Sequence, residues 1–232
     1  MLNKDLIKNN FQKSIMTYDE NAIVQGQMAE FLCSKIQKQK YKKILEIGSY
    51  TGKLTKLAVK KFDFDSYVAL DVVDSFDFIK NLSPKISFIQ SDIENFETSD
   101  KFDLIISNAS IQWAEDFEFV YKKLKSLLTS SGHIAISLFG SDNLLEIKDI
   151  FNVGLKYYSV EEIEKITSAN IYSEIKKIKF KDSISILKHL KATGVNSVTN
   201  KKYSYIELKQ NLSLFEKKYN NTLTYNPIYV ID

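Results

Sequence analysis

Residues 44–52 read ILEIGSYTG, in which a mostly apolar stretch at 44–47 leads into a turn with two glycines, Gly48 and Gly52. A short buried strand that ends in a glycine-rich turn lets a ligand approach the backbone at the start of the next helix. A dinucleotide-binding loop, G-x-G-x-x-G, needs glycines where this chain has Tyr50 and Lys53. The stretch therefore predicts a ligand site at the end of a first strand, and it argues against a dinucleotide oxidoreductase.

The segments around this stretch alternate between strand-like and helical spacing, which is typical of a parallel sheet with crossover helices. Strands are predicted at 44–48, 66–71, 86–90, 102–107, 133–139, 171–180 and 223–231. Helices are predicted at 22–39, 52–62, 115–128, 142–153, 160–168, 183–192 and 204–219, with Gly132 stopping the helix at 115–128. We expect an α/β fold with a seven-stranded, mostly parallel sheet, flanking helices and a helical lid insert before the last strand. One domain is expected over 1–232, with an N-terminal helical cap at 1–43 and the lid at 182–221.

The composition excludes several protein classes. Hydrophobic residues make up 44% of the 232 residues, which permits a sizeable core and excludes global disorder. No apolar run approaches the ~18 residues of a membrane helix, and the first residues lack a signal-peptide core, so we expect a cytoplasmic protein without membrane association. One cysteine and two histidines argue against a metal site.

The charge is distributed unevenly along the chain. All 32 cationic residues are lysine, so no guanidinium fork is present for a carboxylate or phosphate. Residues 176–218 hold eleven lysines against three acids, whereas residues 92–118 hold eight acids against one lysine. The lysine-rich segment predicts a positive surface that attracts an acidic partner.

The loop resembles the S-adenosylmethionine loop of the class I, Rossmann-like methyltransferases, which reads E-x-G-x-x-x-G. Glu46, Gly48 and Gly52 match that pattern, whereas Tyr50 replaces the usual middle glycine. The resemblance implies S-adenosylmethionine as the cofactor and S-adenosylhomocysteine as its product.

Polar residues also follow the next three predicted strands. Asp71, 19 residues after Gly52, is placed to accept both ribose hydroxyls. Asp92 is placed to accept from the adenine amino group, with Ile93 beside the ring, and Asn108 lies where the reacting methyl is expected. Ligands of open α/β sheets bind outside the carboxyl ends of the strands, where these residues are predicted to lie.

Four segments, over nearly the whole chain, resemble the malonyl-acyl-carrier-protein O-methyltransferases of biotin biosynthesis (BioC). The opening segment at 11–25 includes FQKS and TYD, and residues 107–113 match S-N-x-x-x-Q-W. Residues 187–196 (LKHLKATGVN) resemble the family's lid segment, and residues 223–225 resemble its closing strand.

The resemblance implies methyl transfer to the free carboxylate of malonyl carried on an acidic acyl-carrier protein or on coenzyme A, an early step of pimeloyl and biotin synthesis. A carboxylate is already a nucleophile at neutral pH, so no general base is needed. The family's lid usually offers an arginine for this carboxylate, and lysine stands at the matching position here. The implied roles are catalytic for Tyr18 and Trp113, cofactor-binding for Gln25, Glu46, Gly48, Gly52, Asp71, Val72, Asp92, Ile93 and Asn108, and substrate-binding for Tyr18, Gln112, Lys188 and Lys191.

Two other functions remain open at this point. The chain can be another small-molecule methyltransferase of the same superfamily, or a non-catalytic protein with the same fold, which the residue at position 50 permits. A nucleic-acid methyltransferase is disfavoured because no N-P-P-Y-type motif follows the fourth strand. We expect no nucleic-acid partner, and a monomer.

Overall fold

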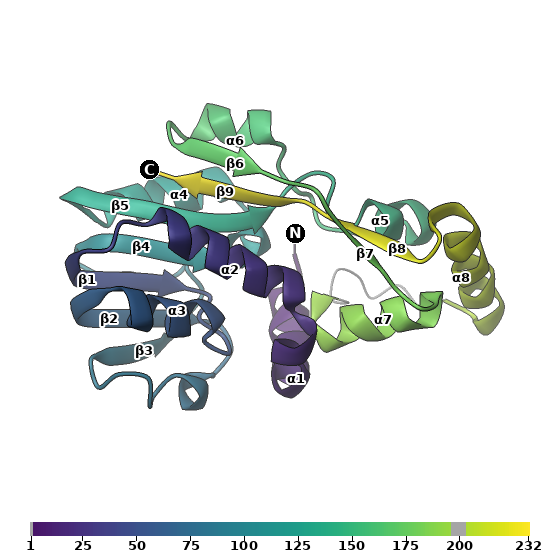
Figure 1. The fold of residues 1–232 in the computed structure, drawn as a ribbon, viewed down its shortest axis with the longest axis horizontal. Coiled ribbons are helices and arrows are strands. Elements are labelled where there is room, and N and C mark those ends of the chain that lie inside the picture. Colours follow the sequence, from purple (N-terminus) through teal and green to yellow (C-terminus); the bar gives the residue numbers. More distant parts are fainter. Residues whose placement is uncertain (1, 196–202) are drawn as a thin grey trace. The chain divides into compact units, whose positions relative to one another are not determined.

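The computed structural model describes residues 2–195 and 203–232 and contains a seven-stranded sheet (Figure 1). Its strands are β1 (Lys40–Ile47), β2 (Asp63–Asp71), β3 (Ile86–Gln90), β4 (Phe102–Asn108), β5 (Leu128–Phe139), β6 (Asn170–Ser173) and β9 (Pro227–Ile231). They lie in the order β3-β2-β1-β4-β5-β9-β6. The pairs among β1 to β5 are parallel, and β6 pairs antiparallel with β9. The predicted mostly parallel sheet is confirmed.

Helices alternate with the strands along the first part of the chain. The helices are α1 (Lys4–Asn21), α2 (Ile23–Lys35), α3 (Lys53–Lys61), α4 (Phe117–Ser126), α5 (Leu145–Phe151), α6 (Val160–Ile166), α7 (Ser183–Ala192) and α8 (Tyr205–Tyr219), with short 3-10 turns at Phe76–Phe78 and Ile111–Trp113. The inner strands are buried over Ile44–Ile47 and Leu104–Ile106, and all of these residues except Glu46 are apolar, as expected for a parallel sheet that is covered on both faces.

Gly132 does not end a helix, contrary to the sequence prediction. Helix α4 ends at Ser126, and β5 begins at Leu128 and runs through the glycine. The register of β4 and β5 shifts between Phe102 and Leu104, and a Cβ at position 132 would lie 2.6 Å from the carbonyl oxygen of Phe102. A glycine within a strand often marks such a bulge, where two backbones approach closely.

The strands predicted at 171–180 and 223–231 are each two strands. The earlier one divides into β6 and β7 (Lys176–Lys179), and the later one into β8 (Thr222–Tyr225) and β9. Strands β7 and β8 pair antiparallel in a separate two-stranded sheet. The break is held by Asn226, whose amide nitrogen donates to the carbonyl of Glu174 over 3.1 Å.

The chain divides into two compact units. The sheet unit comprises Ile23–Leu138, Val160–Ser173 and Ile228–Asp232. The lid unit comprises Met1–Ala22, Phe139–Ser159 and Glu174–Pro227. Of the cap predicted at 1–43, α1 belongs to the lid unit and α2 to the sheet unit, and residues 40–43 are already part of β1. The predicted lid at 182–221 lies between β7 and β8, and the single domain stays a prediction.

Within the lid unit, α1 packs against the end of α7, and we call this contact the α1–α7 joint. The hydroxyl of Thr17 donates to the carbonyl of Ala192 over 3.1 Å. Gly194 has a φ of +72°, and a Cβ there would lie 2.8 Å from both Phe11 and Ser14. The opening and lid segments that carry the family resemblance therefore contact each other across about 175 residues of sequence. Asn196, the last residue of the lid segment, lies outside the described residues.

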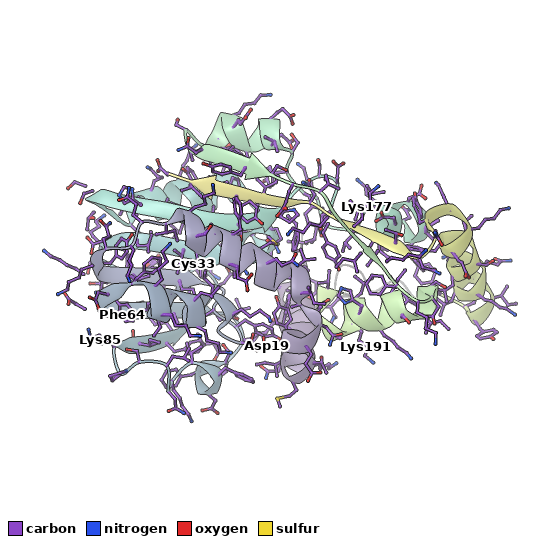
Figure 2. The ribbon with its side chains drawn as sticks, in the orientation of Figure 1. Asp19, Cys33, Phe64, Lys85, Lys177 and Lys191 are labelled. Carbon is purple, nitrogen blue, oxygen red and sulfur yellow. The ribbon has the colours of Figure 1, made fainter. Side chains whose placement is uncertain are left out.

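Two further observations concern the described residues as a set. No helix among them is long and apolar enough to cross a membrane. None of their His, Cys, Asp and Glu side chains gather in a group of three or more that could hold a metal ion. Cys33, the one cysteine of the sequence, is buried on α2 (Figure 2).

Candidate cofactor site

The loop between β1 and α3 depends on two glycines. Gly48 has a φ of +74° and Gly52 a φ of +80°, a region that favours glycine. A Cβ on Gly48 would lie 2.2 Å from the hydroxyl oxygen of Ser110, and one on Gly52 would lie 2.7 Å from Ile79. The N–H of Gly48 donates to the carbonyl of Leu70 over 2.7 Å. The loop is therefore held against β2 and leads directly into the N-terminus of α3, where free N–H groups favour an anionic or polar ligand.

Tyr50 adopts the backbone conformation that a glycine adopts easily. Its φ is +40°, and this left-handed conformation costs a residue with a Cβ about 1–2 kcal/mol. Its N–H donates to a carboxylate oxygen of Asp71 over 2.9 Å, and its side chain is buried. The replacement of glycine at this position therefore leaves the turn in place.

Asp71 ends β2 beside this loop and is buried. Its second carboxylate oxygen accepts from the N–H of Val73 over 2.8 Å, so both oxygens are oriented by the backbone. Desolvation raises the pKa of Asp71 to about 6, although the N–H donors oppose this shift. Each oxygen keeps a further lone pair, and the carboxylate can accept hydroxyl groups such as those of a ribose.

Glu46, predicted to bind the cofactor, lies inside the sheet unit with 1% of its surface exposed. One of its carboxylate oxygens accepts from the hydroxyls of Thr55 and Tyr67, each over 2.6 Å. Burial raises the pKa of Glu46 to about 7, against the lowering effect of these two donors. The side chain joins β1, β2 and α3 behind the loop, so it supports the loop from its buried side.

Asp92 and Ile93 follow β3, at the same edge of the sheet as the loop. Asp92 accepts from the N–H of Glu94 over 3.0 Å in a turn that orients its carboxylate, and Ile93 is buried. Val72 is half-buried, and its carbonyl accepts from the side chain of Gln90 over 3.0 Å. A carboxylate beside apolar side chains suits an adenine amino group and ring.

Asn108 connects three elements at the end of β4. Its amide nitrogen donates to the carbonyl of Gln25 on α2 over 3.0 Å. Its amide oxygen accepts from the hydroxyl of Ser137 on β5 over 2.7 Å. The side chain of Asn108 therefore holds α2 at the end of β4. Its predicted role in cofactor binding stays a prediction.

Two buried polar atoms near the loop have no hydrogen-bond partner among the described residues. They are the hydroxyl oxygen of Ser49 and the side-chain oxygen of Gln112. Gln112 donates its amide N–H to the carbonyl of Ala109 over 2.7 Å, so its acceptor oxygen is held in a fixed place. Buried polar groups without partners are rare in native proteins, and a functional role is one of their recognised explanations.

These atoms fit the amino-acid end of S-adenosylmethionine. That end carries an ammonium donor and a carboxylate acceptor, which are complementary to the acceptor oxygen of Gln112 and to the hydroxyl donor of Ser49. Asp71 and Asp92 suit the ribose and adenine ends. The polar groups at this edge of the sheet are therefore chemically compatible with the cofactor, and the role of each residue in binding it stays a prediction.

The structure places the remaining predicted residues as follows. Gln25 is buried on α2 and Trp113 is half-buried in the turn after β4, both in the sheet unit. Tyr18 is half-buried on α1, and Lys188 and Lys191 are exposed on α7, all in the lid unit (Lys191 is labelled in Figure 2).

Sequence reasoning missed Ser49 and Ser110. Both lie within motifs that the sequence analysis used, but serine is common in loops and its type alone carries no signal. The proximity of Ser110 to Gly48 joins the loop after β1 to the loop after β4, and only the assembled sheet shows this contact.

Comparison with known proteins identifies the family by sequence and similar folds among solved structures. Residues 38–211 match the profile of the methyltransferase domain family. A malonyl-[acyl-carrier protein] O-methyltransferase of Calditerrivibrio nitroreducens is 34% identical, over 97% of this chain and 94% of that protein.

Among solved structures, the YcgJ protein of Bacillus subtilis superposes with a TM-score of 0.63 at 10% identity, over 88% of this chain and 96% of that one. The N-methyltransferase NodS of Bradyrhizobium japonicum, solved with S-adenosylhomocysteine, superposes with a TM-score of 0.50 at 15% identity, over 89% of this chain and 83% of that one. At such low identities these structures show a shared fold.

Proposed function

Because the chain belongs to the malonyl-[acyl-carrier protein] O-methyltransferase family, we propose that it methylates the free carboxylate of a malonyl thioester on acyl-carrier protein. The chain is an S-adenosylmethionine-dependent methyltransferase, and that cofactor, when bound, supplies an activated methyl group. The product ester no longer carries the negative charge of the acid. Masking this charge allows chain elongation, which suits an early step of pimeloyl and biotin synthesis.

The observation that carries this proposal is the α1–α7 joint. Its members Phe11, Ser14 and Thr17 come from the opening segment, and Ala192 and Gly194 come from the lid segment. The loop after β1 occurs in methyltransferases of many kinds, whereas these two segments carry the resemblance to this family. Their contact supports a common role for both segments in shaping the acceptor side of the enzyme.

The chemistry demands little of the protein beyond placement. A malonyl carboxylate is ionised at about pH 7 and attacks without a general base. Positioning the attacking oxygen in line with the methyl group supplies roughly 7–11 kcal/mol of the reduction in barrier. In this proposal Asp71 and Asp92 orient the cofactor, Asn108 holds α2 in place, and Tyr18 and Trp113 exclude water around the methyl group.

The lysines of α7 give the acceptor side its charge. Ile184, Lys188 and Lys191 are exposed and spaced to lie on one face of the helix, opposite the buried Ile186 and Leu190. We assign this face to attraction of the acidic carrier protein and of the malonyl carboxylate. Gln112, predicted to bind the substrate, instead offers an acceptor oxygen that suits the ammonium group of the cofactor. Lysine supplies a point charge where the family usually has an arginine fork.

Mass spectrometry tests the proposal directly. Malonyl-acyl-carrier protein is incubated with the enzyme and S-adenosylmethionine, and we expect the intact carrier to gain the mass of one methyl substitution. Malonyl-CoA in a parallel reaction shows whether the carrier protein is required. A carrier of unchanged mass, with an enzyme that binds S-adenosylhomocysteine, would favour another small-molecule acceptor.

A further inference from the structure

His189 points inward from α7, next to the exposed Lys188. Its Nε2 lies 2.6 Å from the hydroxyl oxygen of Tyr225 on β8, a short hydrogen bond between two side chains. Tyr225 is 3% exposed, whereas His189 is half-buried. The pair therefore combines a buried hydroxyl with a ring that is still partly accessible.

The surroundings of this pair are aromatic. The ring of Phe180 lies 5.0 Å from that of His189, and the ring of Phe139 lies 5.9 Å from that of Tyr225. Phe139 is the last residue of β5. Phe139, Phe180 and the pair itself all belong to the lid unit, so this aromatic environment is built within one unit.

The pair has one hydrogen-bond donor more than it uses. Burial lowers the pKa of His189 and raises that of Tyr225, so both side chains are uncharged near neutral pH. Two protons are then present, one on the ring and one on the hydroxyl, and their mutual bond uses one of them. The other remains at Nδ1 or at the hydroxyl, according to the tautomer, and no described residue accepts it.

We propose that the His189–Tyr225 pair binds an oxygen of the acceptor's carboxylate through this spare donor, an inference that rests on the proposed function. A carboxylate is the strongest kind of acceptor for such a donor, and aromatic surroundings strengthen the bond. An uncharged donor also directs one oxygen without neutralising the charge on the other, which has to attack the methyl group. In this proposal the lysines of α7 attract the substrate, and the His189–Tyr225 pair orients its carboxylate.

A purely structural tie between α7 and β8 is the alternative. Helix α7 is already held by buried Ile186 and Leu190 and by the α1–α7 joint, so the helix has other anchors. A purely structural tie would lower stability when broken, but it would not distinguish a carboxylate from its ester. The two roles also predict different selectivity for charged and uncharged acceptors.

The experiment compares an acid with its ester. Affinities of malonyl-acyl-carrier protein and of its methyl ester are measured by calorimetry on the S-adenosylhomocysteine complex. The proteins are the unsubstituted chain, Tyr225→Phe, His189→Gln and the control Tyr219→Phe, whose hydroxyl donates to Asp149 on the surface. We expect Tyr225→Phe and His189→Gln to weaken binding of the acid about tenfold or more, and that of the ester less than about twofold.

The possible results separate a failure of this inference from a failure of the proposed function. Equal weakening for acid and ester, or no weakening of either, overturns the pair as a carboxylate site while the proposed function stands. If the unsubstituted chain does not methylate the malonyl carrier, the proposed function and this inference both fail. Thermal unfolding of each variant, with retained affinity for S-adenosylhomocysteine, shows that the comparison is made on folded protein.

Discussion

The sheet unit and the lid unit differ in how their polar side chains are held by neighbouring groups. In the sheet unit, Asp71 and Asn108 are held by backbone groups and neighbouring side chains before any ligand binds. In the lid unit, Lys188 and Lys191 are exposed, and the His189–Tyr225 pair retains an unused donor. The polar side chains of the sheet unit are thus already oriented by protein partners, whereas those of the lid unit keep groups that are available to a ligand.

Replacing Asp71 with alanine is expected to have the largest effect, and it tests whether the sheet unit binds the cofactor. The change removes the proposed acceptor of two ribose hydroxyls and also the carboxylate to which the N–H groups of Tyr50 and Val73 donate. Each charge-assisted hydrogen bond contributes about 1.5–3 kcal/mol, so we expect affinity for S-adenosylhomocysteine to fall about a hundredfold or more. Calorimetry on Asp71→Ala and on the exposed control Asp74→Ala measures this loss. Equal affinities for both variants would remove Asp71 from the cofactor site.

The pH dependence of stability tests the buried support beneath the loop. The pKa of Glu46 is about 7 in the folded chain, above its ordinary value of 4.5. Between these values the folded state binds more protons than the unfolded state, so the free energy of unfolding falls as pH rises from about 4.5 to about 7 and then stays level. The full loss is on the order of 3 kcal/mol.

Glu46→Gln removes this titration, so the free energy of unfolding of the variant should decrease less as the pH rises. Asp71, with a pKa of about 6, keeps its own contribution at lower pH, so the difference between the two proteins is clearest between about pH 6 and about pH 7. Denaturant unfolding at several pH values measures it. Parallel curves for the two proteins would mean that the buried carboxyl does not titrate in this range.

Gly194→Ala tests the lid unit in the same way. A Cβ at this position lies 2.8 Å from Phe11 and Ser14, on a backbone with positive φ, so we expect a local loss of about 1–3 kcal/mol. Hydrogen exchange should rise in α1 and α7, and KM for the malonyl carrier should rise while affinity for S-adenosylhomocysteine is retained. Gly154→Ala is the matched control, because a Cβ there meets its nearest atom at 3.8 Å. A weakened cofactor affinity in Gly194→Ala alone would contradict the separation of roles.

A change in salt concentration should have the smallest effect on kcat/KM. It tests whether the lysine-rich segment at 176–218 attracts the substrate. Exposed charges are screened strongly as ionic strength rises from about 0.05 M to about 0.5 M. If the lysines attract an acidic carrier, kcat/KM for malonyl-acyl-carrier protein should fall several-fold more than kcat/KM for malonyl-CoA. Equal salt responses in steady-state assays would exclude docking through this surface.

Much of the sheet unit could be predicted from the sequence because its signals are local. The apolar run at 44–47 predicts β1, the glycines after it predict the turn, and the acids after β2 and β3 predict the polar edge. At Gly132 the prediction from the sequence is wrong, because glycine favours both a helix end and a bulge between two strands, and its type does not distinguish them. The division of 171–180 and 223–231 was hidden for a similar reason, since the alternating pattern continues through both breaks.

By itself the sequence determined the α/β fold, the cofactor loop and the family, because strand periodicity, glycine spacing and contiguous motifs are properties of neighbouring residues. Only the tertiary structure decided that Glu46 supports the loop from behind and that Asn108 holds α2. It also decided that Phe11 meets Gly194 and that His189 meets Tyr225. Most of these contacts join segments that are distant in sequence. They depend on how whole helices and strands pack, and no local pattern of residue types encodes that packing.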